Sequence, residues 1–445
     1  MRFRLLLAAL TLAASAHADR GHRAVSGVAV DRVAIDGKPG HWSDLGAPKK
    51  PALYTIRFDA QGEAVGIPHC NGRERVLVDD EVVDPGTKGP LVVPLTAGVH
   101  AVTIEIKASP YEKRLACSEA PRVGAPVTIT DGVSVLRFTS PLEIRARGGG
   151  EAVVFVPGGH DPTKPAALLV GTHPWNGTPW TYAAYRELLD EAGQKDLVLL
   201  FPNGLGNSLY VADAEEEVLR ALDAVTKEIA IDPQRVSIWG ASMGGAGATT
   251  IAFHHPDRFA YVASYFGDSK YDLNTYVNKL FGGEQNARQV NALDVLENAR
   301  HLPVFLVHGE SDHTSPIRQS VMLFEAMKQI GFDVDFERVP GMAHEGPLVI
   351  RYIRRVVDAA ARAVAPARPT RVSFRSVRPG DVSAYGVTLE RVSRTTDAFA
   401  DLERKDDGIH VLAAEGVKRI VLATDALGGG KPAILPSSVP VVWSE

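Results

Sequence analysis

The sequence predicts an α/β protein in which a domain with one doubly wound sheet stands between two β domains. Strands alternate with amphipathic helices from about residue 131 to residue 365, which is the pattern of a parallel sheet covered by helices. Short strands separated by Gly, Pro and Asp occupy residues 19–130 and 366–445, which indicates β structure on both sides. The length of 445 residues leaves room for these domains.

Residues 1–18 have the three parts of an export signal. Arg2 and Arg4 carry positive charge, residues 5–16 are largely apolar, and Ala16-His17-Ala18 supplies the small residues of a cleavage site. We therefore expect this segment to be removed and the protein to be secreted, either to a periplasm or out of the cell. No other stretch approaches the ~20 apolar residues of a membrane span, so we expect no membrane anchor.

Residues 19–130 predict an N-terminal β-sandwich, because runs of alternating or β-branched residues are separated by turn sequences such as Asp84-Pro85-Gly86. Export places the two cysteines in an oxidising compartment, so we expect a disulfide between Cys70 and Cys117. Closing that loop would stabilise the fold by roughly 3–5 kcal/mol. Two buried thiols are the alternative.

Residues 131–365 predict the central α/β domain. Several of its strands are continuous apolar runs, as expected where helices cover both faces of a parallel sheet. Apolar residues at helical spacing predict helices over 213–229 and 316–330. The expected strands are 152–156, 167–171, 197–201, 235–239, 261–265, 304–307 and 333–339.

Residues 363–370, rich in Pro and Ala, predict a linker to a small C-terminal β domain over 366–445. Its expected strands are 372–377, 386–392, 409–413 and 419–423.

Charge and composition exclude several classes of function. The net charge of −5 gives no overall basic field for nucleic acid or an anionic membrane. The 14 histidines include no His-Glu-x-x-His pattern and no cluster with cysteine at zinc spacing, so we expect no catalytic metal and no cofactor.

The segment that carries chemistry is Arg235–Gly245, in which an apolar strand leads into Gly240-Ala241-Ser242-Met243-Gly244 and then into a helix rich in small residues. Glycines two residues before and after the serine clear room for a sharp turn with strained backbone angles. Such a turn places the Ser242 hydroxyl at the carboxyl edge of the sheet, above a helix N-terminus. A structural turn serine is the alternative.

A serine hydroxyl becomes nucleophilic when a histidine takes its proton and a carboxylate orients that histidine. After a serine turn of this kind, the acid and then the histidine follow along the chain. Asp312 comes after the strand 304–307 and is the expected acid, with Glu310 as the alternative. His344 lies in the loop after the next strand and is the expected base.

Acyl transfer also needs two donors to the oxyanion. The backbone N–H of Met243 is one expected donor. The second should come from the loop after the strand 167–171, where Pro174 has no N–H, so the Trp175 N–H is the candidate. His173, Trp180 and Tyr210 lie in or after loops at the same edge and are candidates for lining a substrate cleft.

These motifs resemble those of α/β-hydrolases of the serine esterase and prolyl-oligopeptidase-like group, above all secreted feruloyl esterases and polyhydroxybutyrate depolymerases. The resemblance spans roughly residues 165–360 and implies Ser242 as nucleophile, His344 as base and Asp312 as the acid. His173-Pro174 departs from the His-Gly common in these families. The matching segments are 231–236, 240–245, 254–259, 308–316 and 341–344.

We therefore predict a secreted serine hydrolase that cleaves small or polymeric carboxylic esters, with the ester implied by the resemblance alone. A serine peptidase of the prolyl-oligopeptidase type is the main alternative, although residues 19–130 are too few for a seven-bladed propeller. A carbohydrate- or surface-binding protein with a vestigial hydrolase domain is a third reading, and the intact order of serine, acid and histidine argues against it. The flanking β domains are candidates for binding a polysaccharide or polymer surface.

Overall fold

The computed structural model describes the chain in the following residue ranges: 23–29, 32–35, 38–40, 52–61, 64–67, 70, 72–84, 91–94, 97–107, 132–141, 144, 147, 149–183, 185–273, 275–281, 284–380 and 382–444. The predicted export signal and Cys117 lie outside the described residues. The chain divides into two compact units. Unit 1 comprises residues 1–136 with 180–185, and unit 2 comprises residues 137–179 with 186–445. Within the described residues, no helix is long and apolar enough to cross a bilayer.

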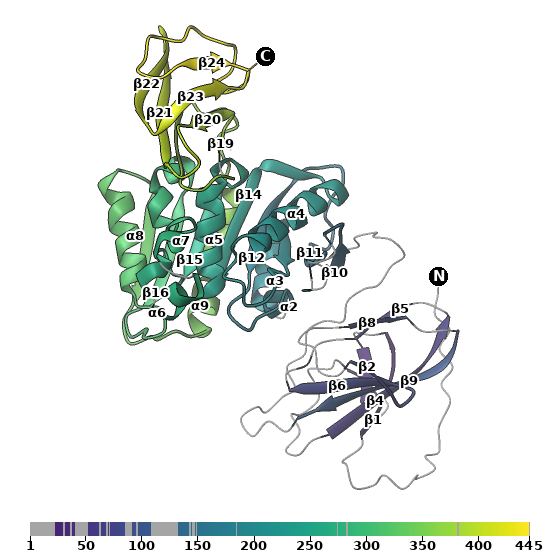
Figure 1. The fold of residues 1–445 in the computed structure, drawn as a ribbon. Helices are drawn as coiled ribbons and strands as arrows, with labels where there is room; N and C mark the ends of the chain where they lie inside the picture. The colour runs from purple at the N-terminus through teal and green to yellow at the C-terminus, as the bar shows by residue number, and fades with distance from the viewer. Residues whose placement is uncertain are drawn as a thin grey trace. The chain divides into compact units, whose positions relative to one another are not determined.

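Unit 1 is built from β-sheets, as the alternating pattern predicts (Figure 1). Along β9, Val102, Ile104 and Ile106 are buried at alternate positions, which is the two-residue period of a strand with one face in a core. The seven-stranded sheet has the order β3 (Lys38–Gly40), β2 (Arg32–Ile35), β1 (Arg23–Ala29), β4 (Ala52–Gln61), β9 (Ala97–Ile106), β6 (Arg73–Val78), β7 (Glu81–Asp84). A second sheet pairs β5 (Ala64–Ile67) with β8 (Leu91–Pro94). A short helix, α2 (Trp180–Ala183), also belongs to this unit.

The central sheet confirms the predicted α/β class. Its order is β10 (Gly132–Arg137), β11 (Glu151–Val156), β13 (Leu197–Pro202), β12 (Ala166–Thr172), β14 (Ile231–Ala241), β15 (Tyr261–Tyr265), β16 (Val304–Gly309), β17 (Val334–Val339). The strands from β13 to β17 pair in parallel, and β11 pairs antiparallel with β13. Every residue of β12, β13, β15 and β16 is buried, so both faces of these strands are covered.

Helices cover the central sheet. Helix α5 (Met243–His254) packs against β12, β14 and β15, while α9 (Pro347–Arg362) packs against α3 (Arg186–Gln194) and against β12, β14, β15 and β16. The predicted helices are α4 (Asp213–Glu228) and α8 (Arg318–Gln329). Between β15 and β16 the chain forms η3 (Tyr271–Leu273), α6 (Thr275–Phe281), α7 (Glu284–Arg288) and η4 (Leu293–His301), and η2 (Pro256–Arg258) follows α5.

The order of the strands determines where a site can form. Strand β12 lies between β13 and β14, so the chain leaves β12 toward one side of the sheet and later returns on the other. In parallel sheets, ligands bind outside the carboxyl ends of the strands at such a reversal. The ends of β12 and β14 are Thr172 and Ala241, next to the predicted oxyanion loop and the predicted nucleophile.

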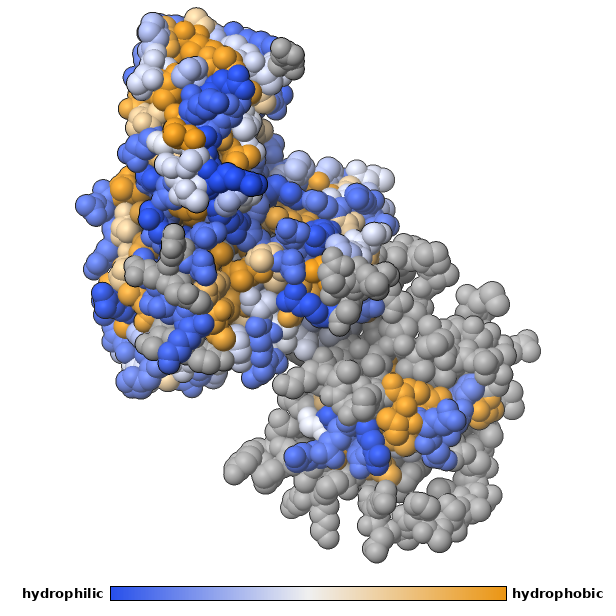
Figure 2. All heavy atoms as spheres, in the orientation of Figure 1, coloured by the Kyte–Doolittle hydropathy of each residue, from blue (hydrophilic) through white to orange (hydrophobic). Residues whose placement is uncertain are grey.

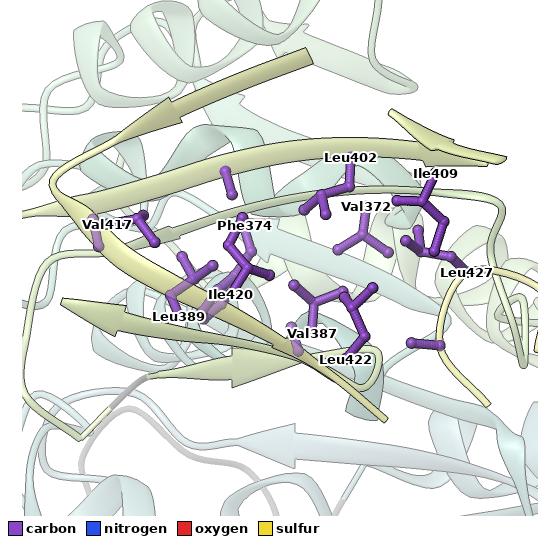
Figure 3. Close-up of a cluster of buried hydrophobic side chains, with 14 residues drawn as sticks. Val372, Phe374, Val387, Leu389, Leu402, Ile409, Val417, Ile420, Leu422 and Leu427 are labelled. Carbon is purple, nitrogen blue, oxygen red and sulfur yellow. The ribbon is translucent and has the colours of Figure 1, made fainter. Parts of the chain in front are cut away.

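The C-terminal β domain is a small sandwich. One sheet has the order β18 (Arg371–Ser376), β21 (Ala398–Lys405), β22 (Gly408–Glu415). The other sheet has the order β19 (Ser383–Ala384), β20 (Val387–Arg391), β23 (Val417–Leu422), β24 (Val441–Trp443). Figure 3 shows side chains of both sheets meeting in one core, among them Phe374, Leu389, Leu402 and Ile420. Exposed hydrophobic residues on this domain are scattered among polar ones (Figure 2), and they include Val392, Leu412 and Val442.

This domain attaches at the amino ends of the central strands. Gln234, near the start of β14, exchanges hydrogen bonds with Ala365 in the linker before this domain, and the hydroxyl of Tyr385 in the domain donates to the Pro256 carbonyl at 2.7 Å. Ser242 follows the other end of the same strand. At about 3.3 Å per residue, the two ends lie roughly 25 Å apart. The C-terminal β domain therefore lies at the edge of the sheet opposite Ser242.

Candidate active site

The backbone at Ser242 forms the sharp turn that the glycine pattern predicts. Ser242 has φ 58° and ψ −122°, a conformation that L-residues rarely adopt, and α5 begins at the next residue. A Cβ on Gly244 would lie 1.8 Å from the Thr172 carbonyl oxygen, and one on Gly240 would lie 2.4 Å from the Gly244 carbonyl. Only glycine fits at either position, so the two glycines permit the close contact of strand, turn and helix.

Thr172, which the sequence analysis did not single out, ties the end of β12 to this turn. Its buried hydroxyl lies 2.7 Å from the Gly244 carbonyl oxygen and 2.9 Å from that of Trp239. A hydroxyl has one proton, so it donates to one of these carbonyls at a time. The contact holds the turn against the loop that follows β12.

His344 lies between Ser242 and Asp312. Its Nδ1 is 2.7 Å from Asp312 Oδ2, and its Nε2 is 2.7 Å from Ser242 Oγ. Because a carboxylate only accepts, Nδ1 carries the proton and Nε2 accepts from the serine hydroxyl. The Phe266 ring packs on the imidazole with a centroid separation of 4.5 Å. The three side chains come from loops after β14, β16 and β17.

Asp312 is fixed from several sides. Its side chain has no exposed surface, and Oδ1 accepts the backbone N–H groups of Thr314 and Ser315 at 2.8 and 2.9 Å. Burial alone would raise the pKa of Asp312, but the donors His308 and His344 outweigh it and hold the pKa well below its usual range. The carboxylate is therefore ionised at neutral pH.

The structure also separates Asp312 from the alternative acid. The Glu310 side chain is 37% exposed and pairs with Arg338 at 3.2 Å. It is Asp312 that contacts His344.

Met243 is the first residue of α5, so its backbone N–H belongs to the helix N-terminus, where partial positive charge favours an anion. Trp175 lies in the loop after β12, in a turn closed by the Gly177 N–H donating to the Pro174 carbonyl at 2.8 Å. Since β12 and β14 are neighbouring parallel strands, this loop and the Ser242 turn leave the sheet at the same edge. The two predicted oxyanion donors therefore lie in segments that follow the carboxyl ends of neighbouring strands.

The three candidates for a substrate cleft are buried. His173 is 1% exposed, and its two ring nitrogens face the carbonyl oxygens of Pro174 and Asn203. Burial lowers the pKa of His173. Tyr210 has no exposed surface and packs beside the His173 ring. The His173 ring thus connects the loop after β12 to the loop that contains Asn203. Trp180, 8% exposed, belongs to unit 1.

A second group of polar residues lies behind Asp312. His308, at the end of β16, places Nε2 3.3 Å from Asp312 Oδ2 and is fully buried. Asp268, in the loop after β15, accepts the Ser315 hydroxyl at 2.5 Å, and burial raises the pKa of Asp268. The sequence signal for His308 was its place at the end of a predicted strand, directly before Gly309. Asp268 has no such signal.

Among the described residues, no group of three or more His, Cys, Asp or Glu side chains is arranged so that it could hold a metal ion.

Comparison with known proteins places the serine turn and the histidine in one family segment. Residues 212–362 match the model of the prolyl oligopeptidase family. The chain is 24% identical over 192 residues to a dipeptidyl-peptidase 5 of Porphyromonas endodontalis, and 26% identical over 150 residues to an uncharacterized peptidase, YuxL, of Bacillus subtilis. These alignments cover 37% and 29% of this chain. They span only 27% and 22% of the two relatives' lengths.

Among solved structures, an S-formylglutathione hydrolase from Agrobacterium tumefaciens aligns with a TM-score of 0.46 and 17% identity, over 52% of this chain and 95% of that one. A fluorophosphonate-binding serine hydrolase of Staphylococcus aureus aligns with a TM-score of 0.43 and 18% identity, over 52% of this chain and all of that one. The sheet order, the serine turn and the family match together make the central domain an α/β-hydrolase domain of the serine hydrolase class.

Proposed function

We propose that this chain hydrolyses carboxylic esters through an acyl-enzyme, with Ser242 as nucleophile, His344 as general base and Asp312 as the residue that orients the histidine. The observation that carries the proposal is the continuous hydrogen-bonded series from Ser242 Oγ through His344 to Asp312, with both contacts at 2.7 Å. Nucleophile, base and orienting carboxylate are in the mutual reach that this chemistry requires.

In the acylation step, His344 Nε2 takes the hydroxyl proton as Ser242 Oγ attacks the substrate carbonyl carbon. The negative charge on the carbonyl oxygen is met by the Met243 N–H at the helix N-terminus, with the Trp175 N–H proposed as the second donor. His344 then gives the proton to the leaving alcohol. Water repeats the sequence on the acyl-enzyme, which releases the acid and restores Ser242.

Asp312 stays ionised throughout and stabilises the imidazolium that forms on His344. Its depressed pKa supports this role, because a protonated acid would neither orient Nδ1–H nor compensate the positive charge. No metal or cofactor takes part in the proposed steps.

Peptide hydrolysis is the second candidate function. It is favoured by the match of residues 212–362 to the prolyl oligopeptidase family. We further propose that the protein is exported, on the evidence of the charged, apolar and small-residue parts of residues 1–18. The C-terminal β domain lies at the edge of the sheet opposite Ser242. This position supports a role as a scaffold or as a surface that binds a partner away from the active site, and not a role in lining the active site.

The test uses Ser242→Ala with Ser311→Ala as the matched control, because Ser311 is an exposed serine in a loop at the same edge of the sheet. We expect Ser242→Ala to lower the hydrolysis of p-nitrophenyl acetate by about 10⁴–10⁶-fold and to abolish fluorophosphonate labelling. Ser311→Ala should retain both. Labelling of the Ser242→Ala variant at wild-type level would show that the nucleophile is another residue.

The same preparation distinguishes the two candidate substrates. Short esters, feruloyl sugars, hydroxyalkanoate oligomers and unblocked peptides are compared by kcat/KM. The proposal expects the largest value for an ester with an unactivated alcohol. A larger kcat/KM for peptides would show that the protein acts as a peptidase and not as an esterase. The roles of Ser242, His344 and Asp312 would stay the same.

A further inference from the structure

We propose that His308 is a positioning residue for the reaction: from the end of β16, its Nε2–H holds the Asp312 carboxylate in the orientation in which that carboxylate accepts His344. This inference rests on the proposed function, because it assigns a second histidine to the acid of the proposed triad. His308 itself has no surface through which it could touch a substrate, since its side chain is 0% exposed.

The hydrogen bonds of His308 define which ring nitrogen carries the proton. Nε2 lies 2.8 Å from the Ser315 carbonyl oxygen and 3.3 Å from Asp312 Oδ2. Both of these groups only accept, so Nε2 must be protonated. Nδ1 lies 2.8 Å from the Ser320 hydroxyl, which can donate to it. The ring is thus held at both nitrogens, and its Nε2–H is hydrogen-bonded to the Ser315 carbonyl with Asp312 Oδ2 within 3.3 Å.

Asp312 then has a donor on every side. Oδ2 faces two imidazoles, His344 Nδ1 at 2.7 Å and His308 Nε2 at 3.3 Å. Oδ1 faces the N–H groups of Thr314 and Ser315. Rotation of the carboxylate would leave at least one buried donor without an acceptor, which is costly in a site of low dielectric. The four donors together fix the direction of the lone pair that His344 uses.

The two histidines differ in what supports them. His344 lies in a loop and is 19% exposed, as suits a base that must reach the substrate side. His308 belongs to a strand that is buried along its whole length, with β15 and β17 on either side. The carboxylate is therefore fixed relative to the sheet by His308, and the loop histidine is fixed relative to the carboxylate.

Asp268 is a further titratable group that faces this cluster. Asp268 accepts the Ser315 hydroxyl, while the Ser315 N–H donates to Asp312, so Ser315 links the two carboxyl groups. Asp312 is thus acted on by the hydrogen bonds of His308, His344 and Ser315 and by the charges of His344 and Asp268. Each of these groups can affect the pH profile, so a change after substitution of His308 is interpreted together with their contributions.

Removing the Nε2 donor should weaken catalysis without weakening binding. The carboxylate gains freedom to turn, and a misplacement of about 1 Å in a catalytic group costs up to ~10²-fold in rate. With one donor fewer, Asp312 is also more basic, so it stabilises the protonated form of His344 more strongly. The acidic limb of kcat/KM, where the general base becomes protonated, therefore moves to higher pH.

The experiment compares His308→Phe, which keeps a ring but has no donor, with His308→Gln, whose side-chain amide can place an N–H near the position of Nε2. Active sites are counted by fluorophosphonate titration, so that unfolded protein does not enter kcat. For His308→Phe we expect kcat to fall by about 10–100-fold, KM to stay within about twofold, and the acidic limb to move to higher pH. His308→Gln should recover most of kcat and return the limb toward its wild-type position.

Two results would overturn the inference. One is a His308→Phe enzyme with wild-type kcat and an unmoved acidic limb, which would make His308 a packing residue. The other is a folded His308→Gln enzyme as impaired as His308→Phe, which would show that the donor is irrelevant.

A measurement on the unsubstituted protein covers the case in which the variants do not fold. In ¹⁵N-histidine-labelled protein, the buried, solvent-protected imidazole should show a protonated Nε2 and an unprotonated Nδ1 over the whole pH range of the activity profile. The opposite tautomer would refute the assignment. This readout needs no turnover. A wild-type protein that cleaves neither esters nor peptides and takes no label would count against the proposed function, whereas the tautomer would still decide the contact between His308 and Asp312.

Discussion

The end of β16 passes so close to the loop that carries His344 that a side chain at Gly309 would displace it. A Cβ at this position would lie 2.3 Å from the Met342 carbonyl oxygen and 2.7 Å from its carbonyl carbon. Real Cβ contacts are not shorter than 3.0 Å, so Gly309→Ala requires a backbone shift of at least about 0.7 Å, the difference between 3.0 and 2.3 Å. The atoms in the way belong to the backbone, which cannot rotate aside as a side chain can.

Met342 precedes His344 by two residues, so the shift falls on the loop of the base. If His344 moves with it, the distance from Nε2 to Ser242 Oγ grows from 2.7 Å to about 3.4 Å, beyond the range of a good hydrogen bond. We expect kcat/KM to fall by about 10–100-fold, since a misplacement of about 1 Å costs up to ~10²-fold. This corresponds to a loss of roughly 1.4–2.7 kcal/mol in transition-state stabilisation.

The assay is hydrolysis of p-nitrophenyl acetate per titrated site, with urea unfolding to confirm that the variant is folded. Gly346→Ala is the matched control, because it lies in the same loop, has φ −55°, and has no atom within 4 Å of an added Cβ. A Gly309→Ala enzyme within twofold of Gly346→Ala would refute the reasoning. It would mean that the loop absorbs the added methyl group without moving the histidine.

Two further predictions concern stability. Glu215, buried in α4, is paired with Arg378 of the C-terminal β domain at 2.8 Å and with His255 at 2.6 Å. Arg378→Met should therefore lower the free energy of unfolding by about 3–5 kcal/mol, by urea denaturation at pH 7, whereas Arg394→Met on the exposed surface should change little. Burial raises the pKa of Glu215, but the hydrogen bonds from His255 and Arg378 outweigh burial and hold the pKa below its ordinary value of 4.5. The ion pair therefore stabilises the fold fully above pH 4.5, and this stability is lost as the pH falls through the depressed pKa. The penalty of Arg378→Met should shrink over that acidic range, and a penalty independent of pH would count against the ion pair as its cause. Cys70 is fully buried, and we predict that mass spectrometry under non-reducing conditions finds a Cys70–Cys117 disulfide. Cys70→Ser should then lower the free energy of unfolding by roughly 3–5 kcal/mol. Two alkylatable thiols in the native protein would contradict the disulfide.

The strands of the central sheet were predictable because each is a short apolar run that must be covered on both faces. The segment between β15 and β16 was not, because its longest described element, η4, is a 3₁₀ helix with a non-helical residue at Val295 and does not follow the regular geometry of an α-helix. Strand β21 also went unpredicted. Its Asp401 looks like a solvent residue in sequence, but it is mostly buried and paired with Arg371 across the sheet.

At the candidate site, sequence order and strand ends were sufficient to select Ser242 and His344. They left Asp312 and Glu310 as alternatives, because both follow the same strand and either carboxylate would serve chemically. The backbone path after Gly309 separates them: it turns Asp312 inward to His344 and leaves Glu310 in solvent with Arg338. His173 and Tyr210 were predicted to line a substrate cleft, and the structure places both of them in the interior.

The sequence by itself determined the α/β class, the serine turn and the order of the groups that follow it. These depend on local requirements, such as glycine at a strained turn and apolar runs in covered strands, which are written in neighbouring residues. Only the tertiary structure decided which carboxylate meets His344, what stands behind that carboxylate, and at which edge of the sheet the C-terminal β domain lies. The choice of carboxylate and the position of the C-terminal β domain depend on contacts between residues far apart in the chain, such as Asp312 with His344 and Arg378 with Glu215, which no local pattern encodes. His308 lies only four residues before Asp312, but the turn that brings the two side chains together is set by the surrounding loops.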